Sequence, residues 1–264
     1  MKRALDSVFS QTLRPFEVIV VDDGSSDDTS TTINEAFPSV RYYHLENSGV
    51  SNARNVGIDH AAGDWLAFLD SDDEWLPHKL SRQVAALSSD EKYKVCHTEE
   101  IWIRHGIRVN SAKKYAKKGG WIFTDCLPLC AISPSTVIIH RSVFDEIGQF
   151  DTQLPSCEDY DLWLRITAKY PVLLIDEPQI KKYGGHDDQL SQQFWGMDRF
   201  RITALKKIID SGQLSSKNQQ AALDMLLKKA AIFFNGAIKH EKIDEAHHYQ
   251  QLIKRYQNLA PPIK

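Results

Sequence analysis

The segment GDWLAFLDSDDEWLP, residues 63–77, joins an apolar run to a cluster of carboxylates. Its apolar part predicts a β-strand, and Asp70, Asp72, Asp73 and Glu74 follow that strand within five positions. Clustered carboxylates repel each other, so the arrangement destabilises the fold unless something compensates for it. A divalent metal ion would compensate for the repulsion, and a solvated turn that caps the next helix is the alternative.

The segments around this one alternate between strand and helix patterns. Strands are predicted at residues 16–23, 40–45 and 64–70, and a helix pattern follows each of them, at about residues 28–37, 51–62 and 77–87. Strands that alternate with helices are typical of an α/β fold in which helices flank a mostly parallel, Rossmann-like sheet.

The second half of the chain has a looser pattern. Strand candidates at residues 94–103 and 134–140 are followed by an amphipathic helix at 158–170 and a short strand at 171–178. From residue 192 onward only helices are predicted, and the last two form a hairpin. We therefore expect a first domain over residues 1–190 and an all-helical C-terminal extension over residues 191–264.

Composition excludes several classes of protein. The 264 residues are 42% hydrophobic and 25% charged, which is typical of soluble globular proteins. No apolar run reaches the roughly 18 residues that cross a bilayer, and the N-terminus lacks the features of a signal peptide. These observations predict a cytoplasmic protein. The four cysteines form no CxxC pair, so we expect reduced, buried thiols.

The charge is distributed unevenly along the chain. Residues 199–264 carry a net charge of +7, which leaves −10 for the first 198 residues. An acidic body argues against a nucleic-acid partner, because such proteins are basic at the site itself. Two explanations of the basic tail remain open: a solvated helix surface, or peripheral contact with the cytoplasmic face of a membrane that holds lipid-linked acceptors.

Two acidic pairs are expected at one edge of the sheet. Ligands of open parallel sheets bind beyond the carboxyl ends of the strands, where Asp22 and Asp23 close one strand and Asp70 and Asp72 follow another. Alternate residues of an extended backbone share a face, so Asp70 and Asp72 can converge on one ligand. Carboxylate oxygens suit magnesium or manganese, which hold diphosphate oxygens between protein and nucleotide.

Four segments follow one another in a recognisable order. They are VIVVDDGSSDDT (18–29), ENSGVSNARNVGI (46–58), GDWLAFLDSDDEWLP (63–77) and CEDYDLWLRI (157–166). Together they resemble the inverting nucleotide-sugar glycosyltransferases of family 2, which have the GT-A fold. The resemblance covers about residues 2–191. It implies a GT-A-like first domain, a divalent metal cofactor and a nucleotide-sugar donor, with a UDP-sugar favoured.

The resemblance also implies roles for residues on the nucleotide side of the site. Asp23 is expected to accept a hydrogen bond from the nucleotide base, with Asp22 beside it in a structural role. Arg54 is expected near the nucleotide, although an arginine on a helix surface is the alternative reading. Asp70 would approach the ribose or the metal, and Asp72 would coordinate the metal.

On the acceptor side the resemblance points to the helix at residues 158–170. Asp159 is expected to act as the base that takes the proton of the acceptor hydroxyl as it attacks the anomeric carbon. Asp161 is expected to be a capping or surface residue. His186 is a candidate metal ligand or diphosphate contact, and a loop histidine with no ligand role remains the alternative. The acceptor would be a glycan or a lipid-linked saccharide.

The resemblance is incomplete at the N-terminus. The family opens with an apolar strand, whereas Met1 lies where the helix after that strand begins. Lack of this strand, beside the one that ends at Asp23, is expected to leave two neighbouring strands without hydrogen-bond partners. An upstream start, a degraded copy and completion by another chain each explain it. The chain is thus predicted to be a metal-assisted inverting glycosyltransferase or a catalytically impaired nucleotide-sugar-binding remnant.

Overall fold

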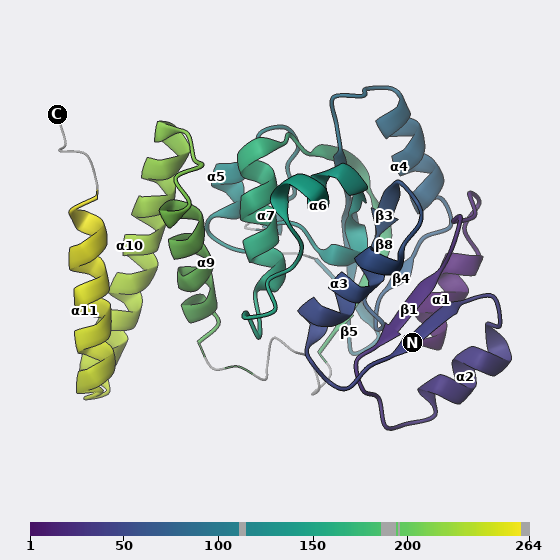
Figure 1. Cartoon of the computed structure of the whole chain (residues 1–264), viewed down its shortest axis with the longest axis horizontal. Coiled ribbons are helices and arrows are strands. Elements are labelled where there is room, and N and C mark those ends of the chain that lie inside the picture. The colour runs from purple at the N-terminus through teal and green to yellow at the C-terminus, as the bar shows by residue number, and fades with distance from the viewer. Residues whose placement is uncertain (111–114, 186–193, 195, 260–264) are drawn as a thin grey trace.

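The structure is a computed structural model that describes residues 1–110, 115–185, 194 and 196–259. Figure 1 shows a body of strands and helices, with three helices gathered at one end. These are α9 (Asp198–Asp210), α10 (Ser216–Lys239) and α11 (Ile243–Gln257). In the part of the chain that is described, no helix is long and apolar enough to span a membrane.

The first half of the chain alternates between helices and strands, as predicted. Its elements are α1 (Lys2–Phe9), β1 (Ile19–Asp22), α2 (Thr29–Ala36), β2 (Arg41–His44), α3 (Val50–His60), β3 (Trp65–Ala67), β4 (Glu74–Trp75) and α4 (Lys79–Ser88). The two-residue strand β4 was not predicted. It forms because Glu74 and Trp75 pair with the late strand β8 (Leu173–Gly184), a contact that local sequence patterns do not reveal.

The second half contains the remaining strands and the central helix. Its further elements are β5 (Val95–Arg104), β6 (Ile107–Val109), α5 (Phe123–Cys126), the 3₁₀ helix η2 (Pro134–Thr136), β7 (Ile138–His140), α6 (Arg141–Ile147) and α7 (Glu158–Lys169). The strand predicted at residues 171–178 continues as β8 to Gly184, because it pairs with β5 along its length, with register shifts at Thr98/Glu99 and Glu99/Glu100.

The α/β fold class is confirmed, but the strand directions are mixed. Strands β3, β7, β5, β8 and β4 form one sheet in that order, with β6 added at β5. Among the described pairings only β1–β2 and β5–β8 are parallel, and the others are antiparallel. The expectation of a mostly parallel sheet was therefore wrong. Strand direction depends on how the chain crosses over between strands, which side-chain periodicity does not specify.

Strands β1 and β3 lie in separate sheets. Among the described strands, β1 pairs only with β2, and β3 pairs only with β7. The sheet is thus interrupted between the strand that ends at Asp22 and the strand that precedes Asp70.

Helix α7 lies at the centre of the hydrophobic core. Leu162, Trp163 and Ile166 are completely buried in a cluster that also includes side chains of α9 and α10. Asp161 is buried too and accepts bonds from Arg165 (2.9 Å) and Lys207 (2.7 Å). It therefore links α7 to α9, and the expectation that it is a capping or surface residue was wrong. This packing fixes the position of the first residues of α7.

Candidate active site

Arg54 joins three parts of the chain that are far apart in sequence. Its Nη2 atom donates to Oδ1 of Asp70 at 2.7 Å, and its Nη1 atom donates to Oε1 of Glu158 at 2.6 Å. Arg54 lies on α3, Asp70 follows β3 and Glu158 is the first residue of α7. The arginine therefore brings the two acidic motifs predicted from the sequence to one place. Its role is more than that of a helix-surface arginine.

Charge pairing keeps this arginine ionised. Burial alone would lower the pKa of Arg54, but the carboxylates of Asp70 and Glu158 raise it well above its ordinary value. Burial raises the pKa of Glu158, with a further contribution from the charge of Asp159, while Arg54 opposes both. A planar guanidinium that holds two carboxylates fixes the relative positions of α3, the residues after β3, and α7.

Ser135 organises the turn after β3. Its hydroxyl accepts a bond from the backbone N–H of Asp70 (3.1 Å) and donates to Oδ2 of Asp73 at 2.6 Å. The other carboxylate oxygen of Asp73 accepts the backbone N–H of Tyr183 at 3.0 Å. Asp73 is buried, and burial together with the charge of Asp70 raises its pKa to about 7. Asp73 thus anchors the acidic turn to β8.

The remaining residues of the acidic turn have different surroundings. Asp72 is half-buried, and its backbone carbonyl accepts a bond from Arg3 of α1. Arg3 also stacks over the ring of Tyr183 at 3.6 Å. Glu74 binds Lys181 at 2.7 Å, so it acts as a cross-strand partner between β4 and β8. The turn is therefore held from both sides, with Asp70 and Asp72 between the anchors.

Asp159, the predicted base, lies beside Cys130, which the sequence did not indicate as part of the site. The Sγ atom of Cys130 is 2.9 Å from Oδ2 of Asp159, and the backbone N–H of Tyr160 lies 2.7 Å from Oδ1. Burial and the neighbouring Asp159 charge raise the pKa of Cys130 well above that of an ordinary thiol. The cysteine therefore stays protonated and can donate its hydrogen to the carboxylate.

Asp22 and Asp23 are occupied by contacts within their own region. Asp22 accepts bonds from the Tyr42 hydroxyl (2.6 Å) and the Ser25 N–H (2.8 Å), which outweigh its burial and lower its pKa to about 2. Asp23 accepts the backbone N–H groups of Ser48 and Gly49, both at 2.8 Å. Asp23 therefore orders the loop between β2 and α3, which leads into the helix that carries Arg54, whereas Asp22 ties the turn after β1 to β2.

Lys182 of β8 is a charged residue of this region that sequence reasoning missed. Its ammonium group donates to the Ser133 hydroxyl at 3.0 Å. Burial would lower the pKa of Lys182, but Glu100, Asp73 and Asp70 raise it above its ordinary value. Lys181 and Lys182 are adjacent in a strand, so their side chains lie on opposite faces. This alternation indicates that one of the two lysines faces the acidic turn, but it does not indicate which one.

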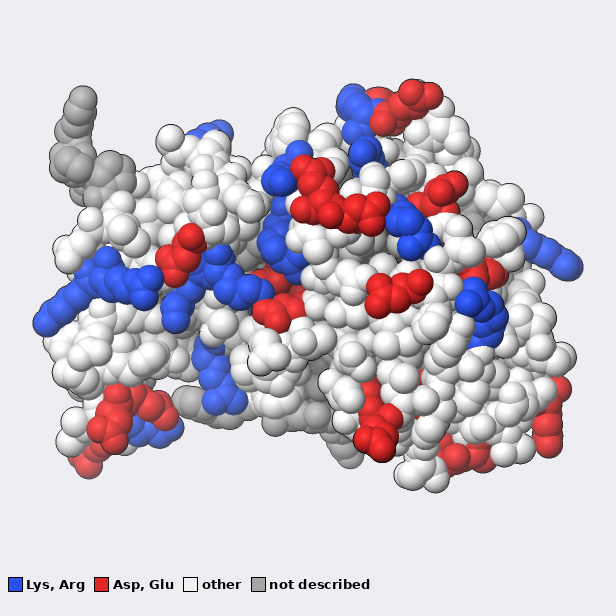
Figure 2. All heavy atoms as spheres, viewed as in Figure 1, with Lys and Arg blue, Asp and Glu red and all other residues white. Residues whose placement is uncertain are grey.

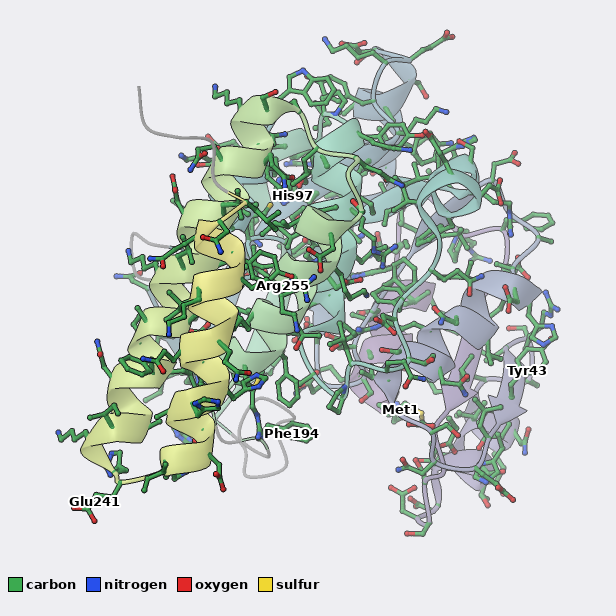
Figure 3. All side chains as sticks on the ribbon, turned by 60° about the vertical axis from the view of Figure 1, so that its left-hand side comes forward. Met1, Tyr43, His97, Phe194, Glu241 and Arg255 are labelled. Atoms are coloured by element: carbon green, nitrogen blue, oxygen red, sulfur yellow. The ribbon has the colours of Figure 1, made fainter. Side chains whose placement is uncertain are left out.

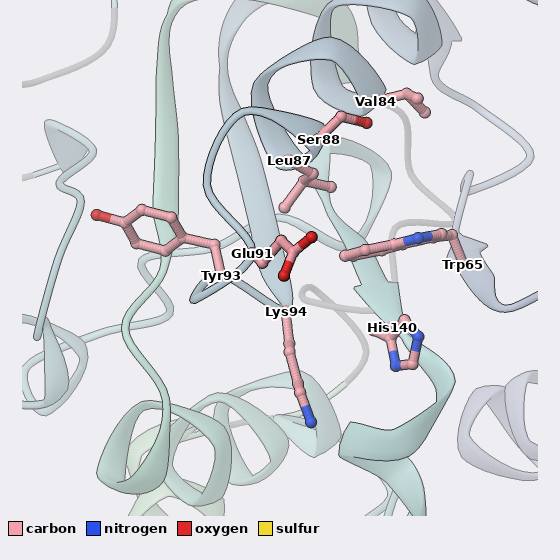
Figure 4. A pocket seen from close by; sticks show the side chains of 8 residues that line it. All are labelled: Trp65, Val84, Leu87, Ser88, Glu91, Tyr93, Lys94 and His140. Carbon is pink, nitrogen blue, oxygen red and sulfur yellow. The ribbon is translucent and has the colours of Figure 1, made fainter.

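His186, predicted as a metal ligand, lies outside the described residues. The hollow drawn in Figure 4, of about 310 Å³, is lined by residues that include Trp65 and His140. Trp65 begins β3, whereas Asp70 lies beyond the other end of that strand. This hollow is therefore separate from the candidate active site.

The sequence also matches a known family. Residues 1–148 match the family described as glycosyl transferase family 2, and this match covers more than half of the chain. The chain belongs to glycosyl transferase family 2. The matched range includes Asp22, Asp23, Arg54, Asp70 and Asp72, whereas Asp159 lies beyond it.

Individual proteins are similar over larger ranges. An uncharacterized glycosyltransferase of Rickettsia felis is 32% identical over 206 residues, which cover 73% of this chain and 33% of that protein. The Escherichia coli enzyme UDP-Glc:alpha-D-GlcNAc-diphosphoundecaprenol beta-1,3-glucosyltransferase WfaP is 32% identical over 173 residues, 62% of this chain and 64% of the enzyme. The chain thus spans about a third of the length of the Rickettsia relative.

A solved structure supports the fold. The structure of Staphylococcus aureus TarS 1-349 in complex with UDP-GlcNAc superposes with a TM-score of 0.66. The alignment covers 99% of this chain and 89% of that one, at 16% sequence identity. The identity is too low to carry over residue roles, but the chain shares the GT-A-like α/β fold of TarS.

Proposed function

We propose that this chain transfers a sugar, with inversion, from a nucleotide-diphosphate donor to an acceptor hydroxyl. The donor would be a UDP-sugar and the acceptor a glycan or a lipid-linked saccharide. The observation that supports the proposal best is the pair of bonds from Arg54 to Asp70 and Glu158, because it brings the donor-side and acceptor-side motifs together. The names of the relatives agree with it, since WfaP acts on a diphosphoundecaprenol-linked sugar.

The chemical step needs one base and one departing diphosphate. Asp159 would take the proton from the acceptor hydroxyl while the oxygen forms a bond to the anomeric carbon. The bond from that carbon to the nucleotide diphosphate breaks on the opposite face, which inverts the configuration. Arg54 would hold Asp70 and the start of α7 in fixed relative positions, so that the donor and the base stay aligned.

A divalent metal fits the carboxylates of the acidic turn. Among the described residues no group of three histidine, cysteine or acidic side chains could hold a metal alone. Magnesium sites in transferases use one or two carboxylates, and the substrate phosphates complete the coordination. Asp70 and Asp72 would supply such a pair, with His186 as a further candidate. When bound, the metal would offset the charge of the diphosphate.

The C-terminal helices would bring the chain to a membrane that contains its acceptor. Residues 199–259 contain eleven lysines and arginines and five acidic residues. Figure 2 shows basic side chains in a band across the helical end of this face, with acidic side chains at its upper edge and a further acidic group below it. Such a band would be attracted to anionic lipids. Sedimentation with vesicles that contain phosphatidylglycerol, compared with neutral vesicles, tests this contact.

Calorimetric titration of UDP, with and without manganese, tests the donor site. We expect metal-dependent binding that Asp72→Ala abolishes, whereas Asp159→Asn retains binding and loses transfer. UDP binding by a wild-type chain that transfers no sugar to any acceptor in a lipid-linked panel would instead support a nucleotide-sugar-binding remnant. A folded chain that binds neither UDP nor other nucleoside diphosphates would contradict both functions.

A further inference from the structure

A groove lies between α9 and α11, next to the start of α7. One face of α9 provides Arg199, Ile202, Thr203 and Lys206, whose spacing of three and four residues places them in one row. Helix α11 provides His248, Tyr249 and Leu252 on the opposite side. The groove has a volume of about 460 Å³.

The groove has an apolar floor and a cationic rim. Ile202, Tyr249 and Leu252 are buried, and they form its floor together with Phe200. Arg199, Lys206 and His248 contribute the polar rim, and none of the described residues that line the groove is acidic. Asp198, the nearest acidic residue along α9, is paired with Arg201 at 2.7 Å and Lys229 at 2.9 Å. The groove therefore favours a ligand that combines an apolar or sugar surface with negative charge.

The groove reaches the segment that precedes the predicted base in the chain. Pro155 lines it and lies four residues before Asp159. Ser156 and Cys157 follow Pro155 in the chain and contact Met197 at 3.6 and 3.7 Å. Met197 immediately precedes α9, so these contacts hold the start of α9 in place. Figure 3 shows Phe194 between the C-terminal helices and the rest of the molecule, and its ring packs edge-on against Phe200 at 5.4 Å. A ligand in the groove would thus extend toward the start of α7.

We propose that this groove binds the acceptor, and that the acceptor is a saccharide linked to a phosphate or diphosphate. Aromatic side chains pack against sugar rings, while Arg199 and Lys206 are placed to bind phosphate oxygens. This inference rests on the proposed glycosyl transfer and adds both the location and the charge of the acceptor. The groove belongs to the helical extension, which lies outside the range matched by the family.

Filling the groove tests its role without disturbing the core. Thr203 is exposed on α9, so Thr203→Trp adds bulk over the floor, and Thr203→Ser is the matched control that leaves the groove open. The probe is N-acetylglucosaminyl diphosphate that carries a short alkyl chain. We expect Thr203→Trp to raise the acceptor KM about tenfold or more, with UDP affinity unchanged. Equal acceptor KM values for the two variants would overturn the inference.

A charge reversal tests the phosphate contact. Lys206→Glu should weaken binding of the diphosphate probe but not of the matched alkyl N-acetylglucosaminide, which has no phosphate. The control is Lys217→Glu, an exposed lysine on α10 that does not line the groove. Equal weakening of both probes by Lys206→Glu would show that no phosphate is recognised there.

Direct calorimetry of the probe separates the two proposals. A chain that binds the probe in the groove but transfers no sugar would retain the binding site and contradict the transferase. A chain that transfers sugar equally well with Thr203→Trp would retain the transferase and contradict the groove. Probe binding that persists in both Thr203→Trp and Lys206→Glu would place the saccharide elsewhere.

Discussion

Two cations, one partly buried and one completely buried, occupy very different surroundings in this molecule. Arg54, at the candidate active site, lies between the carboxylates of Asp70 and Glu158. Lys79, on α4, is completely buried and has as its partners the amide oxygen of Gln83 at 2.8 Å and the ring of Trp75 at 4.3 Å. The first cation is held charged by two anions, whereas the second has only neutral partners.

The pKa values of the two groups move in opposite directions. The carboxylates raise the pKa of Arg54, while burial lowers the pKa of Lys79 to about 7. Burial alone therefore does not mark a functional charge. Two carboxylates arranged around one cation do, because their mutual position is fixed, at a high desolvation penalty for the buried Glu158, and serves other groups. The predictions below test this distinction.

The largest effect is expected for Arg54→Ala. The substitution leaves the buried carboxylate of Glu158 uncompensated and frees Asp70 to move. Removing one partner from a buried ion pair destabilises a protein by about 3–5 kcal/mol. Displacement of the reacting groups by about 1 Å costs on the order of a hundredfold in rate, so transfer activity should fall at least that far. Urea unfolding and initial rates measure the two effects.

Arg54→Lys separates charge from geometry. A lysine retains the positive charge but cannot hold two carboxylates with one planar group. We expect stability to recover more than activity does. If Arg54→Lys were as active as the wild-type chain, the bridge between Asp70 and Glu158 would be unnecessary, and the site would have to be reinterpreted around another group.

Lys79→Met tests the opposite case through the pH dependence of stability. The folded-state pKa of Lys79 is about 7, below its ordinary value of 10.5. Between these values the unfolded chain binds more protons than the folded chain, so stability rises with pH through this window. A methionine cannot titrate, and the contribution of Lys79 to this rise, on the order of a few kcal/mol, should disappear. Urea unfolding between pH 6.5 and 10 measures it.

The matched control removes an exposed lysine. Lys92→Met should leave the slope of stability against pH unchanged in this window. At a single pH, whether Lys79→Met raises or lowers the free energy of unfolding depends on Gln83, because its buried amide oxygen loses its donor. Transfer activity should stay near the wild-type level. A large loss of activity would contradict the view that only the paired cation serves the site.

The sequence predicted the motifs of the site better than their connections. Asp70, Asp72 and Asp159 follow from short segments, because the pattern of a strand, an acidic turn and a helix start is local. The bonds from Arg54 cross 16 and 104 positions, so only the folded chain reveals them. Strand direction and the two-residue strand β4 likewise depend on partners late in the chain.

Two further neighbours of the site could not be predicted for a related reason. Lys182 and Cys130 reach the acidic cluster through β8 and the segment before η2, and neither forms a motif with nearby residues. A lone cysteine usually indicates a buried thiol, and this one is half-buried. Its significance comes only from the position of Asp159, which packing of α7 determines.

Cys130→Ala should have a moderate effect on transfer. The substitution removes the thiol that lies 2.9 Å from Asp159, so the base loses a donor that orients it. One hydrogen bond contributes about 1 kcal/mol, which corresponds to a loss of roughly fivefold in kcat. Cys130→Ser keeps a donor and should recover most of the rate. Cys126→Ala, a buried cysteine on α5, is the control and should affect stability only.

The last prediction, for Asp23→Ala, tests whether this residue serves the nucleotide directly or through the loop. Its carboxylate accepts the N–H groups of Ser48 and Gly49, so the substitution frees the loop that leads into α3. Loss of these bonds should destabilise the chain by about 1–2 kcal/mol. Asp23→Asn retains one of the two acceptor oxygens that bind Ser48 and Gly49, so it should recover part of the lost stability. If Asp23 only orders the loop, UDP affinity should recover in the same proportion as stability. If it also contacts the base, affinity should recover less than stability does, because a carboxylate accepts a base N–H more strongly than an amide does. Calorimetry and urea unfolding of the two variants distinguish these roles.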